Sequence, residues 1–151
     1  MDIILRRPTL LDVLYLAENA RQADKDEVLA FSGRTLLETL NDTPGLYINS
    51  NVWEVGGEVI CLFGVTPSDD GNNILWFLAT DEFDKYKRPV SVSCKRIFDE
   101  VVKGYDYLFN YVHADHKKAI RWIKWLACEV SDPEPIGING EMFCKFEVKN
   151  V

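Results

Sequence analysis

The sequence lacks long apolar runs, has few histidines and contains no closely spaced cysteine pair. No apolar run approaches the ~20 residues of a membrane helix, and the first residues do not form a signal peptide, because their charges follow the apolar stretch. Two histidines and four cysteines without C-x-x-C spacing supply no zinc pattern. We therefore expect an intracellular protein without a metal, without a membrane partner and with buried free thiols (Cys61, Cys94, Cys128, Cys144).

Positive charge is also scarce. The net charge of −7 argues against a general nucleic-acid binder, since phosphate binding requires clustered Lys and Arg. The basic residues that are present fall into two groups, at residues 85–96 and 117–124. Each group fits a solvated helix face, and each could also bind phosphate if the fold brings it to a site.

The first half of the chain changes from helical to strand periodicity. Leu10 to Ala17 repeats at helical spacing after a Thr9–Asp12 capping box, and residues 33–41 form a second short helix pattern. Residues 46–55 and 58–65 then favour strands, and Gly56-Gly57 between them is typical of a two-residue hairpin.

The second half alternates between buried strands and helices. Residues 74–79 and 107–112 are apolar runs separated by a helix that begins at Pro89, so the two strands should be parallel. A last helix covers Ala119 to Ala127, and Asn139-Gly140 predicts a type I′ hairpin. The predicted order is β-α-α-β-β-β-α-β-α-β-β in one α/β domain over residues 1–151.

This order resembles that of the GNAT acyltransferases. The opening from Leu5 to Asp12 is similar to their first strand followed by Arg, Thr and Asp, and the segment from His116 to Cys128 is similar to their late helix. The resemblance implies a GNAT-like fold, with a central mixed sheet of six to seven strands and helices on both faces. It also implies possible binding of acetyl-CoA where two parallel strands separate.

A second likeness is to the GNAT-like internal virion or head-assembly proteins of T7-like short-tailed phages. It is carried by residues 103–112 and by Ile120-Arg121-Trp122-Ile123-Lys124. This likeness implies a phage protein with a virion-associated or assembly role, located in the host cytoplasm or within the virion. Its partner would be a phage or host protein.

Two departures from the family pattern place acetyl transfer in doubt. Active members hold the pyrophosphate of acetyl-CoA on a glycine-rich loop at a helix N-terminus, but residues 81–91 contain no glycine, and Pro89 removes one N–H donor. The tyrosine that often protonates the departing thiolate aligns with Ile123. The resemblance therefore suggests a degenerate acetyltransferase site, and the alternative is an active N-acetyltransferase that acetylates an amine.

Several residues could still support catalysis and cofactor binding. His113, directly after a predicted strand, is the first candidate for a general base, followed by Asp81, and Tyr111 could donate a proton. The candidates for phosphate binding lie at the starts of the two later helices, and each could instead be a solubilising surface residue (Lys85, Lys87, Arg88, Ser91, Lys117, Lys118).

Trp122 and Trp125 lie three residues apart on the last predicted helix. That helix already has an apolar stripe at Ile120, Ile123 and Ala127, so the tryptophans make it apolar around much of its circumference. Either the helix is buried on two sides, or Trp122 and Trp125 offer a surface to a protein partner.

Overall fold

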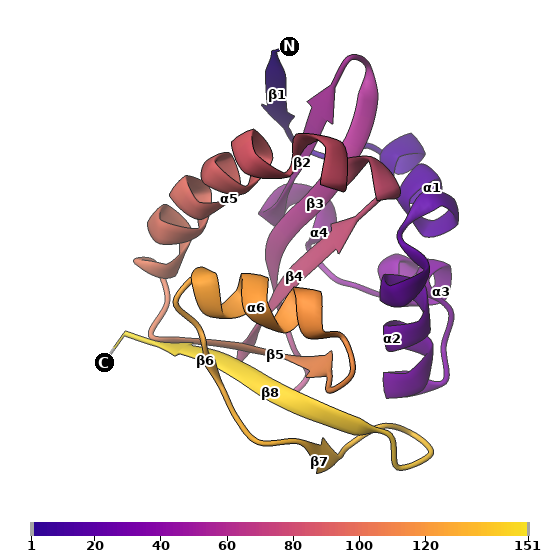
Figure 1. Cartoon of the computed structure of the whole chain (residues 1–151), viewed down its shortest axis with the longest axis vertical. Helices are drawn as coiled ribbons and strands as arrows, with labels where there is room; N and C mark the ends of the chain where they lie inside the picture. The colour runs from indigo at the N-terminus through magenta and orange to yellow at the C-terminus, as the bar shows by residue number, and fades with distance from the viewer. Residues whose placement is uncertain (1, 151) are drawn as a thin grey trace.

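A computed structural model describes residues 2–150 as a central sheet with helices packed against it (Figure 1). The strands are β1 (Ile3–Arg6), β2 (Ser50–Val55), β3 (Glu58–Pro67), β4 (Asn73–Ala79), β5 (Tyr107–His113), β6 (Glu129–Val130), β7 (Glu134–Pro135) and β8 (Met142–Lys149). The helices are α1 (Leu10–Asn19), α2 (Gln22–Ser32), α3 (Leu36–Asn41), α4 (Leu46–Asn49), the 3₁₀ helix η1 (Asp81–Tyr86), α5 (Lys87–Val102) and α6 (Lys117–Trp125).

The sheet is mixed and runs in the order β1-β2-β3-β4-β5-β8-β6, with β7 paired to β8. Among the strands of residues 2–150, β4 and β5 are the only parallel pair, as their connection through α5 requires. A core under α5 and α6 includes Val90, Cys94 and Ile123, and a second core under α1, α3 and α4 includes Leu16 and Leu40. The predicted α/β class, with helices on both faces of a mixed sheet, is confirmed.

The turn between β2 and β3 follows the sequence prediction. Val55 pairs with Glu58, and the two glycines between them have φ of 60° and 83°. Side chains disfavour such positive φ angles, so a Gly-Gly pair closes this tight hairpin without strain. The hairpin sets the register of the first pairs only, because the register shifts by one residue between Glu54 and Trp53.

Four local predictions were wrong. Helix α2 was not anticipated, and residues 46–49 form α4 where a strand was expected. The segment expected to be a polar linker, Thr80 to Arg88, contains η1 and the start of α5, which begins two residues before Pro89. At Asn139-Gly140 only the glycine has positive φ, 81°, so the turn between β7 and β8 is a longer loop and not type I′. Across residues 2–150, no helix is both long enough and apolar enough to cross a bilayer.

Arg6 holds β1 to α1 and to β2. Its guanidinium lies 2.6 Å from Asp12 and 2.9 Å from Glu54, and Asp12 also completes the predicted capping box with Thr9. The hydrogen bond from Arg6 holds the pKa of Asp12 below its usual value. Because the pKa is lowered on folding, Asp12 stabilises the fold above its unfolded pKa of about 4, and this stabilisation is lost as pH falls through the folded value.

Asp12→Asn is therefore expected to lower the free energy of unfolding by about 1–2 kcal/mol at pH 7, through loss of the cap and the charge-assisted bonds. The difference from the unmodified protein should be smaller at about pH 2.5 than at pH 7, because the stabilisation declines as the pH falls toward the lowered pKa of Asp12. Urea unfolding at both pH values measures this, with Asp69→Asn in an exposed loop as the control. An equal difference at both pH values would contradict the assignment.

Candidate functional site

The two parallel strands β4 and β5 separate soon after they meet. Each is seven residues long, yet they pair only at Asn73 with Leu108 and at Ile74 with Phe109. Beyond that point the Asn110 side chain bridges the gap by donating to the Leu75 carbonyl oxygen at 2.8 Å. In Figure 1 the arrows of β4 and β5 diverge toward α2.

The separation leaves part of the β4 backbone facing an open gap. Thr80 N–H donates to the Ile60 carbonyl oxygen at 2.9 Å, so the even-numbered residues of β4 bond to β3. Backbone groups alternate in direction along an antiparallel pair. The N–H and C=O of Phe77 are therefore directed into the gap between β4 and β5.

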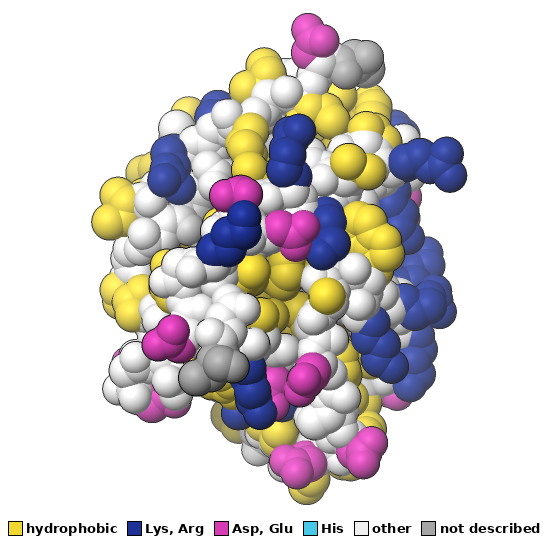
Figure 2. All heavy atoms as spheres, turned by 90° about the vertical axis from the view of Figure 1, so that its left-hand side faces the viewer, with side chains coloured by type: hydrophobic (Ala, Val, Ile, Leu, Met, Phe, Trp, Pro, Cys, Tyr) yellow, Lys and Arg dark blue, Asp and Glu magenta, His cyan; other side chains and the backbone are white. Residues whose placement is uncertain are grey.

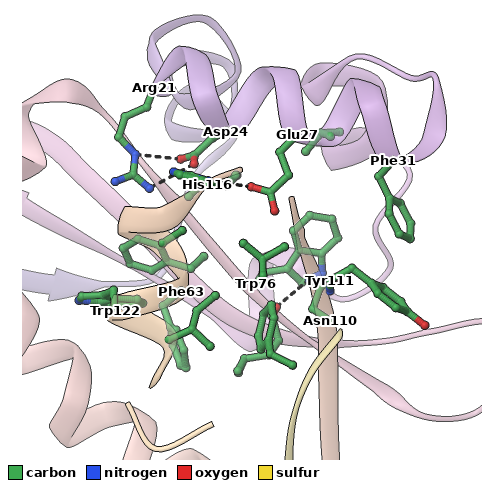
Figure 3. Close-up of a pocket in the computed structure, with 18 of the residues that line it drawn as sticks. Arg21, Asp24, Glu27, Phe31, Phe63, Trp76, Asn110, Tyr111, His116 and Trp122 are labelled. Atoms are coloured by element: carbon green, nitrogen blue, oxygen red, sulfur yellow. Dashed lines mark hydrogen bonds and ion pairs between the residues drawn. The ribbon is translucent and has the colours of Figure 1, made fainter. Parts of the chain in front are cut away.

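A cavity of about 310 Å³ occupies this gap. Lys87 and Lys118 line it on the side of α5 and α6, and Phe31 and Arg34 line it on the side of α2. The lining between them is largely aromatic and aliphatic, as the close-up in Figure 3 shows. The cavity thus passes between the strands and is lined by residues from both faces of the sheet.

Three aromatic rings narrow the cavity. Phe77 on β4 and Trp122 on α6 face each other with ring centroids 4.2 Å apart, and Phe83 packs edge-on to both. Trp122 Nε1 donates to Ser91 Oγ at 3.2 Å, which holds the indole against α5. Trp122 is therefore turned inward, whereas Trp125 is 49% exposed. The rings reduce the width of the gap without filling it.

Helix α2 fixes the wide end of the gap through two carboxylates one turn apart. Asp24 accepts the N–H of Ala79 at the end of β4, and Glu27 Oε1 accepts the N–H of His113 at the end of β5, both at 3.0 Å. Arg21 pairs with Asp24 at 3.1 Å. The second oxygen of Glu27, Oε2, lies 3.1 Å from Nδ1 of His116 (Figure 3).

Asp24, Glu27 and His116 also offer ligand atoms within 4.8 Å of one another, a geometry that could hold a metal ion. The guanidinium of Arg21 already bonds both oxygens of Asp24, at 3.1 and 3.3 Å. A cation in this cluster would have to replace Arg21, so the charge arrangement does not favour a metal.

A groove on the outer surface adjoins the cavity. Its volume is about 530 Å³, and it shares Lys87, Lys118 and Trp122 with the cavity lining. Its remaining lining residues are Arg88, Ser91, Val92, Arg121 and Trp125. Figure 2 shows Lys and Arg side chains gathered along the right-hand edge of the molecule, in a chain whose net charge is −7. Clustered cations of this kind favour phosphate groups.

The structure brings together only some of the residues predicted for a site. Lys87, Arg88, Ser91 and Lys118 line the groove, and Tyr111 lines the cavity. Among residues 2–150, four predicted candidates line neither hollow: Asp81, Lys85, His113 and Lys117.

The local contacts of these four explain their placement. Lys85 pairs with Glu82 at 3.0 Å, and Asp81 is exposed on η1. His113 Nδ1 accepts the N–H of Asp115 at 3.1 Å, and its ring packs edge-on against Phe143. The catalytic and binding roles assigned from the sequence stay predictions.

Burial keeps the thiol at the cavity wall in its protonated form. Cys128 lines the cavity, and burial raises the pKa of its thiol to about 12. Such a thiol is protonated at neutral pH. The preceding Ala127 has φ of 78°, a left-handed conformation that favours glycine.

No protein-family model matches the sequence, and no curated protein matches it either. Solved structures do match. Ard1 from Thermoplasma volcanium is 13% identical, with 100% of this chain and 99% of that chain covered and a TM-score of 0.71. The ribosomal-protein-S18-alanine N-acetyltransferase from Escherichia coli is 13% identical (98% and 94% covered), with a TM-score of 0.69.

The yncA protein of Salmonella typhimurium, a putative acetyltransferase solved with acetyl-CoA, is 16% identical over 99% of this chain and 94% of its own, with a TM-score of 0.66. The fold is that of the GNAT acetyltransferases. At these identities the likeness extends to the fold alone. The GNAT prediction from the element order is confirmed at this level, and the phage-specific likeness stays a prediction.

Proposed function

We propose that this GNAT-fold chain is an N-acyltransferase that uses acetyl-CoA as its acyl donor. The observation that carries the proposal is the cavity between the separated strands β4 and β5, because it opens beside a basic groove. A donor with a phosphate-rich head and a narrow, mostly apolar arm fits this combination of charge and shape. When bound, it supplies a thioester carbonyl for attack by an amine.

The chain's own residues divide the binding between head and arm. Lys87, Arg88, Lys118 and Arg121 would pair with the phosphates as point charges, which replaces the missing glycine loop. The amide groups of the arm could bond to the inward-directed N–H and C=O of Phe77, as an added strand would. The Phe77–Trp122 ring pair would contact the arm and exclude water.

Calorimetric titration with acetyl-CoA tests the proposal, and we expect a dissociation constant in the micromolar range. Release of free thiol from acetyl-CoA should then be followed with 2-phenylethylamine, spermidine and a tetrapeptide with a free α-amine. We expect turnover above the amine-free rate with at least one of them. Absence of binding at millimolar acetyl-CoA would overturn the proposal.

A second candidate function is a binding or assembly role in a phage, without catalysis. It is favoured by the glycine-free start of α5, by Ile123 at the cavity wall and by the rings that narrow the gap. A partner surface on α6 would rest on the exposed Trp125 with Lys124 and Arg121 beside it, since Trp122 is turned inward. The protein would then act in the host cytoplasm or within the virion, and the same titration with acetyl-CoA should give no heat of binding.

A further inference from the structure

We propose that His116 accepts the proton of the acceptor amine and that Glu27 is the positioning residue that holds its ring. The inference deepens the proposed acyl transfer and rests on it. Neither residue was among the sequence-based candidates for catalysis. Both line the cavity between β4 and β5, and they come from elements far apart in the chain.

The contacts of His116 define which nitrogen can accept a proton. Glu27 Oε2 lies 3.1 Å from Nδ1 of His116, and a carboxylate can only accept a hydrogen bond. In the neutral ring Nδ1 therefore carries the hydrogen, and Nε2 keeps its lone pair. This is the tautomer that a general base requires, assigned here from the hydrogen bond.

The pair is held rigidly on both sides. Glu27 Oε1 accepts the backbone N–H of His113 at 3.0 Å, so the carboxylate cannot turn away from the ring without losing that bond. The side chains of His116 and Glu27 are only 13% and 19% exposed. A base oriented by a fixed partner in a partly buried site reacts from one geometry, which reduces the entropic cost of the proton transfer.

The charged groups around His116 come from two sides. From α2, Asp24 and Glu27 each have a carboxylate oxygen within 4.8 Å of a ring nitrogen of His116, and Arg21, directly before α2, neutralises Asp24. From the segment that enters α6, Asp115 and Lys117 flank it in the chain, and both are exposed. Glu27 is thus the one charged group bonded to the ring among the described residues.

His113, the other histidine, offers no equivalent arrangement. Its Nδ1 accepts the N–H of Asp115 at 3.1 Å, and its ring packs against Phe143 with centroids 5.1 Å apart. It does not line the cavity. His113 and His116 are close in sequence, but of the two only His116 lines the cavity. His113 is therefore a suitable control position for substitutions of His116.

In the proposed step the neutral amine attacks the thioester carbonyl carbon and forms the new C–N bond. One proton leaves the nitrogen for Nε2 of His116. The C–S bond breaks, its electron pair goes to sulfur, and the thiolate takes the proton from the imidazolium. The products are the amide and free thiol, and His116 returns to its neutral form. No oxidant, reductant or metal is required.

The cavity wall on the side of α2 and β5 indicates the class of acceptor. Phe31 stacks on Tyr111 at 5.3 Å and packs edge-on to Phe143, and Trp76 is anchored by its Nε1–H to Thr66 at 2.7 Å. All four rings line the cavity. We therefore expect a primary amine on an apolar or aromatic skeleton, and 2-phenylethylamine is the probe of choice.

The test compares His116→Gln with His113→Gln in the full-length chain. Thiol release from acetyl-CoA is measured with 2-phenylethylamine and, as a second acceptor, with water alone. We expect His116→Gln to lower kcat about 100-fold with little change in acetyl-CoA affinity, and His113→Gln to stay within about twofold. Equal losses in both variants, or none in His116→Gln, would overturn the role of His116.

Glu27→Gln tests the positioning role. It keeps an oxygen for the His113 N–H but removes the negative charge beside the ring. We expect kcat to fall about tenfold with little change in KM, because the ring loses the partner that fixes its orientation. An unchanged kcat, or a loss that appears in KM alone, would contradict the role of Glu27. If Zn²⁺ raised the activity of the unmodified protein and a chelator reversed the effect, a metal site would explain the activity in place of a histidine base.

If the unmodified protein binds no acetyl-CoA, the proposed function and this inference fail together. If it binds and turns over acetyl-CoA while His116→Gln is equally active, only this inference fails. The two failures are therefore distinguishable in one set of measurements.

Discussion

Asp24→Ala is expected to lower the free energy of unfolding by about 3 kcal/mol, because it removes one partner of a buried charge pair. Asp24 is 5% exposed and accepts bonds from both Arg21 and the backbone N–H of Ala79. Its loss leaves a guanidinium and an amide without their acceptor, and each unsatisfied buried group has a free-energy cost of its own. Urea unfolding measures the change.

Two control variants separate the effect of losing the Asp24 charge from a general effect of substitutions in helix α2. Asp26→Ala, on the exposed side of the same helix, should change the free energy of unfolding by no more than about 0.5 kcal/mol. Asp24→Asn keeps an oxygen for the Ala79 N–H and should fall between the two. A loss in Asp24→Ala no larger than in Asp26→Ala would show that α2 does not fasten the end of β4.

Helix α2 is also the element that the sequence patterns did not predict. Strand and hairpin patterns predicted β2, β3, β4 and β5, because these segments are apolar runs or end at a Gly-Gly turn. Helix α2 has no such stripe. Its buried residue is Asp24, which a periodicity argument treats as solvent-facing. The Asp24 carboxylate is buried where it accepts the N–H of Ala79 at the end of β4. This contact forms only in the folded chain.

The candidate site was only partly predictable for a similar reason. The element order predicted that Lys87, Arg88 and Lys118 lie at the starts of two helices, and in the structure all three line the groove. Their binding of phosphate stays a prediction. Sequence reasoning selected His113 as the candidate base because it directly follows a predicted strand, and it did not weigh His116. The contact that distinguishes His116 is with Glu27, which lies 89 residues away in the chain. The same limit applies to Trp122, which is turned inward by its bond to Ser91.

Replacing Lys87, Arg88 and Lys118 together with Ala should weaken acetyl-CoA binding roughly 100- to 1,000-fold. The three side chains are exposed and line the groove beside the cavity. Each hydrogen bond between a cationic side chain and a phosphate contributes about 1 kcal/mol or more, because the donor and the acceptor are both charged. Calorimetric titration with acetyl-CoA at low ionic strength measures the loss, and added salt should reduce the difference between the variant and the unmodified protein.

Acetyl-pantetheine, which carries the same thioester without phosphates, separates the charge effect from damage to the cavity. Its affinity should be the same in the triple variant and the unmodified protein, because the Phe77–Trp122 region is untouched. Lys124→Ala, on α6 but outside the groove lining, should leave acetyl-CoA binding unchanged. If the triple variant lost both ligands equally, the basic groove would be a structural feature and not the phosphate site. If the triple variant kept its affinity for both ligands, Lys87, Arg88 and Lys118 would not be the residues that bind the phosphates in place of a glycine loop.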